Sequence, residues 1–145
     1  MNRPFTVLCA MVAALAACSK PASFEEFVRA DMAENGVYEF VLDLSDSLST
    51  YDISLFTKVD APVMGRIRAS SSIGLEVAWK EAGAITPALS ETVYLPYGDK
   101  GVSASLYRSG VKPSSPGSWS VLVRPVNPPA GLRGIGIICK RNGTR

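Results

Sequence analysis

The sequence has no histidine among its 145 residues, which limits the chemistry that the chain can perform. Without histidine there is no Ser-His-Asp or Cys-His catalytic site, no histidine metal ligand and no side chain with an ordinary pKa near neutrality. An excess of one charge is also lacking, because 15 Lys and Arg residues face 13 Asp and Glu residues, for a net charge of +2. We therefore expect no nucleic-acid partner, no metal, no cofactor and no enzymatic activity.

Long hydrophobic runs are also missing, because the apolar stretch at residues 5–14 is too short to span a bilayer. It follows Arg3 and precedes Leu15-Ala16-Ala17-Cys18. This order resembles the Leu-small-small-Cys lipobox of bacterial lipoproteins. The resemblance implies that residues 1–17 are a signal peptide and that Cys18 becomes the first mature residue, carrying acyl chains such as palmitate. An ordinary secretory signal cleaved after Ala17, leaving a free Cys18 thiol, is the alternative.

A lipid on Cys18 would make the membrane the first partner of the chain. Two or three acyl chains hold a protein far more firmly than one, since each buried methylene contributes about 0.8 kcal/mol. Residues 18–23 are expected to form a short polar tether. The residue after the lipidated cysteine is Ser19. In enterobacteria an aspartate at this position resembles an inner-membrane retention signal, and because it is lacking here we expect the outer membrane. No acidic cluster follows directly, which favours a domain that faces the periplasm over one at the cell surface.

Cysteine is scarce, with Cys9 inside the predicted signal peptide and Cys18 carrying the lipid. Cys139 would then stand alone, and the mature chain would contain no disulfide. A bridge between Cys18 and Cys139 is the alternative if Cys18 keeps its thiol. The hydrophobic neighbours of Cys139 predict that it lies in the core as a small apolar residue.

Residues 24–145 are predicted to form one all-β domain. Apolar residues alternate with polar ones in seven short segments, and Asn-Gly, Pro-Gly and Pro-Pro steps separate several of them. This pattern predicts an antiparallel β-sandwich of about seven or eight strands, either jelly-roll or immunoglobulin-like. The expected strands are residues 37–44, 51–59, 73–79, 91–95, 102–106, 119–124 and 135–139, with a less regular first strand in 24–32.

Details of the sandwich follow from the same alternation. The first two regular segments, 37–44 and 51–59, are expected to pair with each other as a hairpin. Pro125 and Pro128-Pro129 are expected to end the strand that begins at Trp119, since proline cannot donate to a sheet ladder. The faces that carry Tyr38, Ile53, Leu75, Trp119 and Ile137 are predicted to form the core.

Several segments resemble the gliding-motility lipoprotein GldH family of the Bacteroidota. In the C-terminal third these are Glu91-Thr92-Val93, Pro116-Gly117-Ser118-Trp119 and residues 131–138, and near the start residues 38–44 and 51–55 are similar to its first strand pair. The Tyr-Pro-x-x-Asn-Leu segment of that family has no counterpart in residues 60–72. The resemblance implies a non-catalytic part of a cell-envelope assembly with other envelope proteins as partners.

Aromatic residues offer a second function, the binding of a glycan or another small ligand. Aromatic faces pack against sugar rings as they do against other apolar surfaces. Trp79 and Trp119 fall on inward positions and are expected in the core. Tyr97 and Tyr107 are therefore the candidate ligand-binding residues.

Acidic residues support weaker hypotheses. Asp43, Asp46, Asp52 and Asp60 lack the spacing of a calcium loop, so a solvated surface is expected for them. Glu76 and Glu91 could serve a hydrolase only if the fold set them across one cleft. Arg66 and Arg68 lie in a polar loop and could meet an acidic partner or lipid head groups.

Overall fold

The computed structural model describes residues 23–60, 72–96, 102–129 and 131–143. Eight strands and one short 3-10 helix, η1 (Ala30–Met32), make up the described chain. Turn residues separate the strands, including Asn35 and Gly36, which both have positive φ. The strands are β1 (Ser23–Arg29), β2 (Tyr38–Leu44), β3 (Thr50–Val59), β4 (Ser72–Glu81), β5 (Leu89–Pro96), β6 (Val102–Val111), β7 (Gly117–Val126) and β8 (Leu132–Asn142).

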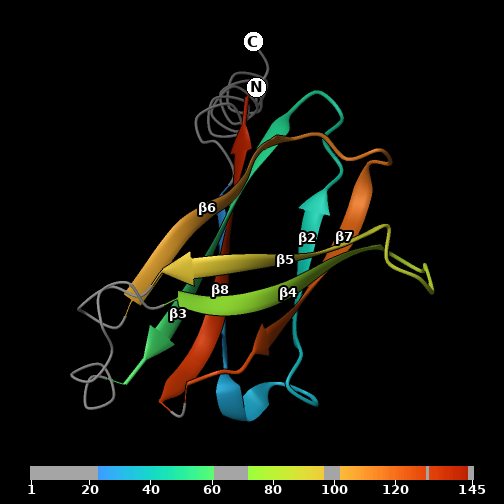
Figure 1. Cartoon of the computed structure of the whole chain (residues 1–145). Helices are drawn as coiled ribbons and strands as arrows, with labels where there is room; N and C mark the ends of the chain where they lie inside the picture. Colours follow the sequence, from blue (N-terminus) through green and yellow to red (C-terminus); the bar gives the residue numbers. More distant parts are fainter. Residues whose placement is uncertain (1–22, 61–71, 97–101, 130, 144–145) are drawn as a thin grey trace, which may run out of the picture.

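The strands form two antiparallel four-stranded sheets, in the orders β1-β8-β3-β6 and β2-β7-β4-β5 (Figure 1). The prediction of an all-β sandwich is confirmed. Most connections cross from one sheet to the other, and only β4 and β5 are consecutive strands that pair directly. This order is that of a jelly roll, the first of the two expected topologies.

The core lies between the sheets and follows the predicted alternation. On β2, Tyr38, Phe40, Leu42 and Leu44 are at most 3% exposed, whereas the residues between them are exposed. All five residues that were expected to mark the inner faces are buried. Cys139 is buried too, and burial, with a smaller effect of the negative charge of Asp52, raises the pKa of its thiol to about 11. The thiol therefore stays protonated and acts as an apolar packing group.

Two local predictions were wrong. Segments 37–44 and 51–59 do not form a hairpin, since β2 pairs with β7 whereas β3 pairs with β6 and β8. Periodicity shows which face of a strand is buried but not which neighbour it has. Pro125 does not end β7, because there the strand has run past the end of β2 and pairs only with β4. A proline in that position removes no hydrogen bond to a second neighbour.

The outer face of the β1-β8-β3-β6 sheet carries a smaller packing cluster of Phe27, Phe56 and Gly136, which lie side by side in the register. Phe56 is only 5% exposed although it points away from the interior. Its ring covers Gly136 so closely that a Cβ there would overlap it. Phe27 stacks on Phe56 with ring centroids 5.9 Å apart. The ring of Phe56 therefore fills the space that a side chain at position 136 would need.

Thr57 is a polar residue inside the core. It is fully buried, and its Oγ1 has no hydrogen-bond partner within the described residues. A buried hydroxyl without a partner costs about 1–3 kcal/mol. Thr57→Val keeps the shape and removes the hydroxyl, so we expect urea unfolding to show a free energy of unfolding raised by about 1 kcal/mol.

Thr57→Ser is the matched control, because it keeps the hydroxyl and removes the methyl group. It should lower the free energy of unfolding. If valine destabilises the protein as serine does, the Thr57 hydroxyl has a partner in solution and the expectation is wrong.

None of the helices in the described part of the chain is long and apolar enough to cross a membrane.

Candidate functional site

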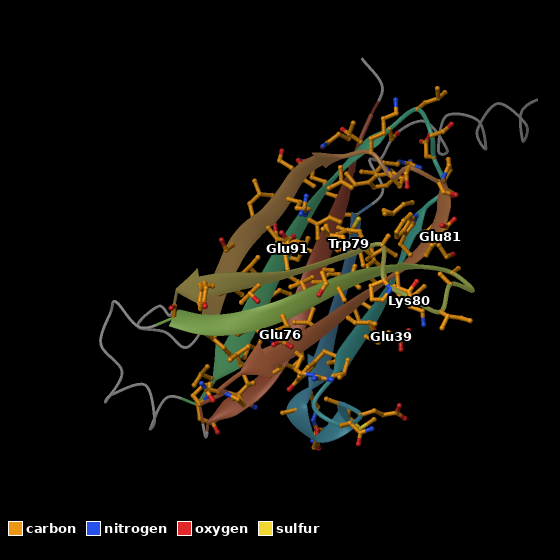
Figure 2. The ribbon with its side chains drawn as sticks, turned by 45° about the vertical axis from the view of Figure 1, so that its right-hand side comes forward. Glu39, Glu76, Trp79, Lys80, Glu81 and Glu91 are labelled. Atoms are coloured by element: carbon orange, nitrogen blue, oxygen red, sulfur yellow. The ribbon has the colours of Figure 1, made fainter. Side chains whose placement is uncertain are left out.

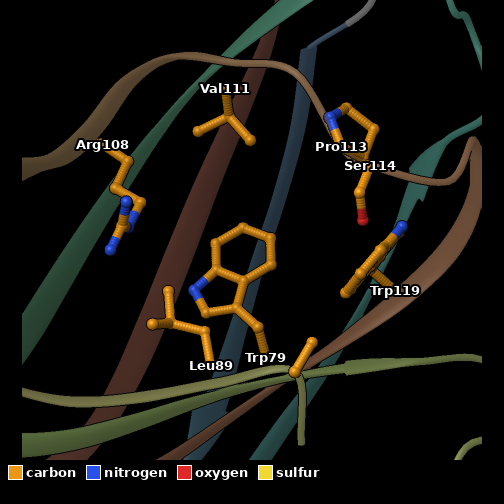
Figure 3. A pocket seen from close by; sticks show the side chains of 8 residues that line it. Trp79, Leu89, Arg108, Val111, Pro113, Ser114 and Trp119 are labelled. Carbon is orange, nitrogen blue, oxygen red and sulfur yellow. The ribbon is translucent and has the colours of Figure 1, made fainter.

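A pocket of about 200 Å³ opens at the edge of the sandwich where β4 ends, β5 begins and β6 leads into β7. Figure 3 looks into it, with Trp79 in the centre, Leu89 to its lower left, Val111 above and Trp119 on the right. Most of the lining is apolar or aromatic, and the polar groups come from one arginine and one serine. The lining residues are Trp79, Ala88, Leu89, Arg108, Val111, Pro113, Ser114 and Trp119.

The two tryptophans are placed by the alternation of β4 and β7, which turns both side chains inward. Trp79 pairs with Val121 and Trp119 with Glu81, so the rings lie near each other. Their centroids are 6.4 Å apart, in an edge-to-face arrangement. Each indole N–H already has an acceptor, because Trp79 donates to the Tyr107 hydroxyl (3.2 Å) and Trp119 to the carbonyl of Ser115 (2.9 Å). The rings therefore offer the pocket apolar surface without unpaired donors.

A bulge in β6 supplies the polar wall of the site. Ile53 pairs with Arg108 and Ser54 with Leu106, so Tyr107 is an extra residue. A bulge of this kind re-aims neighbouring side chains. Asp52 fixes the backbone of β6 just after this bulge, since its Oδ1 accepts hydrogen bonds from the backbone N–H of Gly110 (2.8 Å) and the hydroxyl of Ser109 (3.1 Å). As a result, Tyr107 and Arg108 both reach the same inward carboxylate, that of Glu91 on β5.

Glu91, Tyr107 and Arg108 form one hydrogen-bonded group beside the pocket. Oε1 of Glu91 accepts from the Tyr107 hydroxyl and from Nε (3.1 Å) and Nη2 (2.6 Å) of Arg108. The Tyr107 hydroxyl, and next Arg108, hold the pKa of Glu91 below its ordinary value. Burial, and next the bond to Glu91, raise the pKa of Tyr107. Both shifts lead away from neutrality, whereas a general acid or base needs a pKa near the working pH.

Acid should remove the contribution of Glu91 to stability. Because the pKa of Glu91 is lowered in the folded state, its carboxylate stabilises the fold when the pH is above the ordinary pKa of 4.5. This contribution is lost as the pH falls through 4.5 and on through the lowered folded value. We expect the difference in melting temperature between wild type and Glu91→Gln to be largest near neutral pH and to shrink towards about pH 3. A difference that stays constant over this range would contradict the assignment.

The structure places the sequence-predicted site residues as follows. Tyr107 is half-buried and is not among the lining residues of the pocket; its ring stacks on Trp79 at 6.4 Å and its hydroxyl joins the group around Glu91. Cys18, Tyr97, Arg66 and Arg68 lie outside the described residues. Trp79 and Trp119 are buried as expected, and they also line the pocket.

The paired-carboxylate hypothesis fails on geometry. Glu76 pairs with Thr92 on the exposed face of the sheet, whereas Glu91 pairs with the buried Val77 and points inward. Figure 2 shows the two labels on opposite sides of the β4–β5 ribbon. The sheet thus separates Glu76 and Glu91, and they do not flank a common cleft.

The four aspartates serve separate structural contacts. Asp43 accepts a hydrogen bond from the N–H of Ser45, Asp46 from that of Leu48, and Asp52 holds the turn of β6. Asp60 pairs with Arg133 at 3.5 Å. In residues 23–60, 72–96, 102–129 and 131–143, no group of three or more acidic or cysteine side chains could hold a metal ion.

Sequence reasoning missed Leu89, Arg108 and Ser114 as lining residues. Arg108 enters the site because of the bulge, and nothing in the local pattern announces an extra residue there. Leu89 lies between the expected strands 73–79 and 91–95, whereas in the structure it begins β5.

Comparison with protein-family models gives no match, and comparison with curated proteins gives no significant similarity. The resemblances to bacterial lipoproteins and to the gliding-motility GldH family therefore stay predictions.

Proposed function

We propose that the protein is a lipid-anchored, non-catalytic binding component of the bacterial cell envelope, whose pocket between β5 and β6 receives one sugar ring. The observation that carries the proposal is the pairing of two tryptophan rings with a guanidinium group at the opening. An aromatic floor with a few polar groups at its rim is the usual composition of a small-ligand site. At about 200 Å³ the pocket holds one ring-sized group and is smaller than sites for drug-sized ligands.

Arg108 favours a hydroxyl-bearing ring over a purely apolar group. A guanidinium has five N–H donors. Arg108 donates two of them to Glu91, one from Nε and one from Nη2. The remaining N–H groups can donate to ligand hydroxyls. Glu91 also fixes the plane of the guanidinium, so little side-chain entropy is lost when a ligand binds.

The pocket lies at the end of the sandwich where the tether enters. The strand register connects the two places. Val111, which lines the pocket, pairs with Tyr51, and Tyr51 pairs with Arg141. The residue next to Arg141 is Lys140, which pairs with Ser23, the first residue of β1. The five residues from Cys18 to Ala22 span at most about 18 Å. With Cys18 lipidated, the site would lie close to the membrane surface, and we place it at the periplasmic face of the outer membrane.

Tryptophan fluorescence provides a direct test, since the only two tryptophans in the sequence both line the pocket. The detergent-solubilised full-length protein is titrated with neutral and N-acetylated oligosaccharides. We expect a saturable change in emission for at least one of them, and no change for Ser114→Phe. The exposed Ser114 lies at the rim, so a phenyl ring there fills the opening without entering the core.

Ser90→Phe is the matched control. Ser90 follows Leu89 on β5 but lies on the opposite, exposed face, so this variant should respond like wild type. The proposal is wrong if no saccharide changes the emission, or if Ser114→Phe binds as well as the control.

A role in an envelope assembly is the second candidate function. The outer edge of β2, with which no described strand pairs, favours it, because a partner can pair with an open strand. The resemblance to the GldH family makes the gliding-motility apparatus the first assembly in which to search for partners.

A further inference from the structure

Three of the four edge strands of the sandwich carry a feature that discourages pairing with another chain. Strand β5 has the inward-pointing carboxylate of Glu91, and β6 is interrupted by the bulge at Tyr107. Strand β1 has Glu26, which shares the inward face of Ile137 and is half-buried. Inward charges and bulges are common means of protecting an edge.

Strand β2 has none of these features. Its seven residues pair with β7 in unbroken register, and all of its inward side chains are apolar and buried. It contains no proline, and no strand within the described chain pairs with its other side (Figure 1). A regular edge of this kind is a template for an added strand.

A groove follows β2 on the side of β1. Near the tether end the groove is lined by Phe24, Val41, Asp43 and Arg141, with a volume of about 230 Å³. A second, separate hollow of about 650 Å³ lies farther along the same two strands, lined by Val28, Met32, Val37, Glu39 and Arg124, among others. The two hollows together are called the groove here. Val41 and Met32 are 55% and 70% exposed, so the groove presents apolar surface to a partner.

The groove is also acidic, in a chain whose net charge is +2. Glu39 and Asp43 lie four residues apart on the exposed face of β2, a separation of about 13 Å along the strand. Glu34 and Asp46 lie at the two ends. Three arginines also line the groove, and two of them are paired, since Arg29 contacts Asp31 (2.6 Å) and Arg141 contacts Asp46 (3.7 Å). The acidic side chains of Glu34, Glu39 and Asp43 then outnumber the remaining cation, Arg124.

This charge pattern argues against a second copy of the chain. Antiparallel pairing of β2 with itself about Val41 would place Glu39 of each copy opposite Asp43 of the other. Like charges directly opposite each other destabilise a strand pair.

We propose that the free edge of β2 accepts an extended, basic segment of a partner protein as a fifth strand of the sheet. The segment carries Lys or Arg at two positions four residues apart, opposite Glu39 and Asp43. Of the three residues between them, the middle one is apolar and packs on Val41. The other two are also apolar, point to the opposite face of the added strand and enter the groove. This site is on the opposite side of the sandwich from the aromatic pocket, and neither depends on the other.

The test uses full-length protein in detergent and a labelled peptide, acetyl-Ser-Lys-Leu-Val-Ile-Lys-Ser-amide. Fluorescence anisotropy should show saturable binding to wild type and about tenfold weaker binding to the double variant Glu39→Lys, Asp43→Lys. A peptide with Glu in place of both Lys residues should instead bind the Glu39→Lys, Asp43→Lys variant more tightly than wild type. In the wild-type complex, amide hydrogen exchange should slow within residues 38–44, which attraction between charges alone would not cause.

Glu76→Lys, Glu81→Lys is the matched control, because it reverses two exposed charges on β4 of the same sheet. It should bind the basic peptide like wild type. The proposal is overturned if wild type does not bind the peptide, if both double variants lose binding equally, or if exchange within β2 is unchanged. A wild-type dimer in sedimentation that Glu39→Lys alone strengthens, because the new lysine would then face Asp43 of the other copy, would replace the partner by a second copy.

Discussion

The Gly136→Ala substitution is expected to lower the free energy of unfolding by about 3 kcal/mol, a large loss for one added methyl group. The new Cβ would overlap the ring of Phe56, which lies directly over the glycine. Phe56 cannot turn aside freely, because it is buried and stacked on Phe27. The strain reaches β1, β3 and β8, which contribute the three residues of this cluster.

Urea unfolding followed by circular dichroism measures this loss. Gly143→Ala is the control and should be neutral, since nothing lies within 4 Å of the position of its Cβ. Combining Gly136→Ala with Phe56→Leu should cost less than the sum of the two single variants, because the smaller side chain leaves room for the methyl group. Additive losses would show that the ring is not what excludes a side chain at position 136.

The Cys18→Ala variant is expected to lose its lipid and its membrane attachment altogether. Wild type should fractionate with membranes, stay there in high salt and be released by detergent, because several acyl chains on one residue make anchoring effectively permanent. Metabolic labelling with an alkyne analogue of palmitate should mark wild type and leave Cys18→Ala unmarked.

The other two cysteines provide the controls for this experiment. Cys9 lies in the predicted signal peptide and Cys139 in the core, so Cys9→Ala and Cys139→Ala should be labelled like wild type. Wild-type protein that is soluble and unlabelled would exclude a lipid anchor and leave the ordinary secretory signal.

Much of the fold follows from alternation alone. Ile53, Leu75, Val121 and Ile137 are each flanked by residues of the opposite face, and all four are fully buried. Successive side chains of a strand point to opposite faces, so the positions of the apolar residues show directly which face is buried. Strand pairing does not follow in this way, because in a jelly roll most neighbours in a sheet are distant in the sequence.

The candidate site was harder to predict than the core. The pocket depends on the extra residue at Tyr107, and this bulge turns Arg108 towards Glu91. Bulges are set by the register of two strands far apart in the sequence, here β3 and β6, and a single segment carries no sign of them. Sequence patterning therefore identified Trp79 and Trp119 as core residues without showing that they also line an opening.

The position of β1 has a mechanical consequence. If Cys18 carries the proposed lipid, a pull from the membrane would enter the described domain at Ser23, where β1 pairs with β8 and with no other described strand. A pull directed along the strand would load all seven residue pairs from Ser23 to Arg29 together, in shear, instead of opening them one at a time. Forced unfolding is governed by the rate at which such a ladder breaks. A sandwich loaded in this way would therefore bear tension applied at Ser23 without losing its first strand.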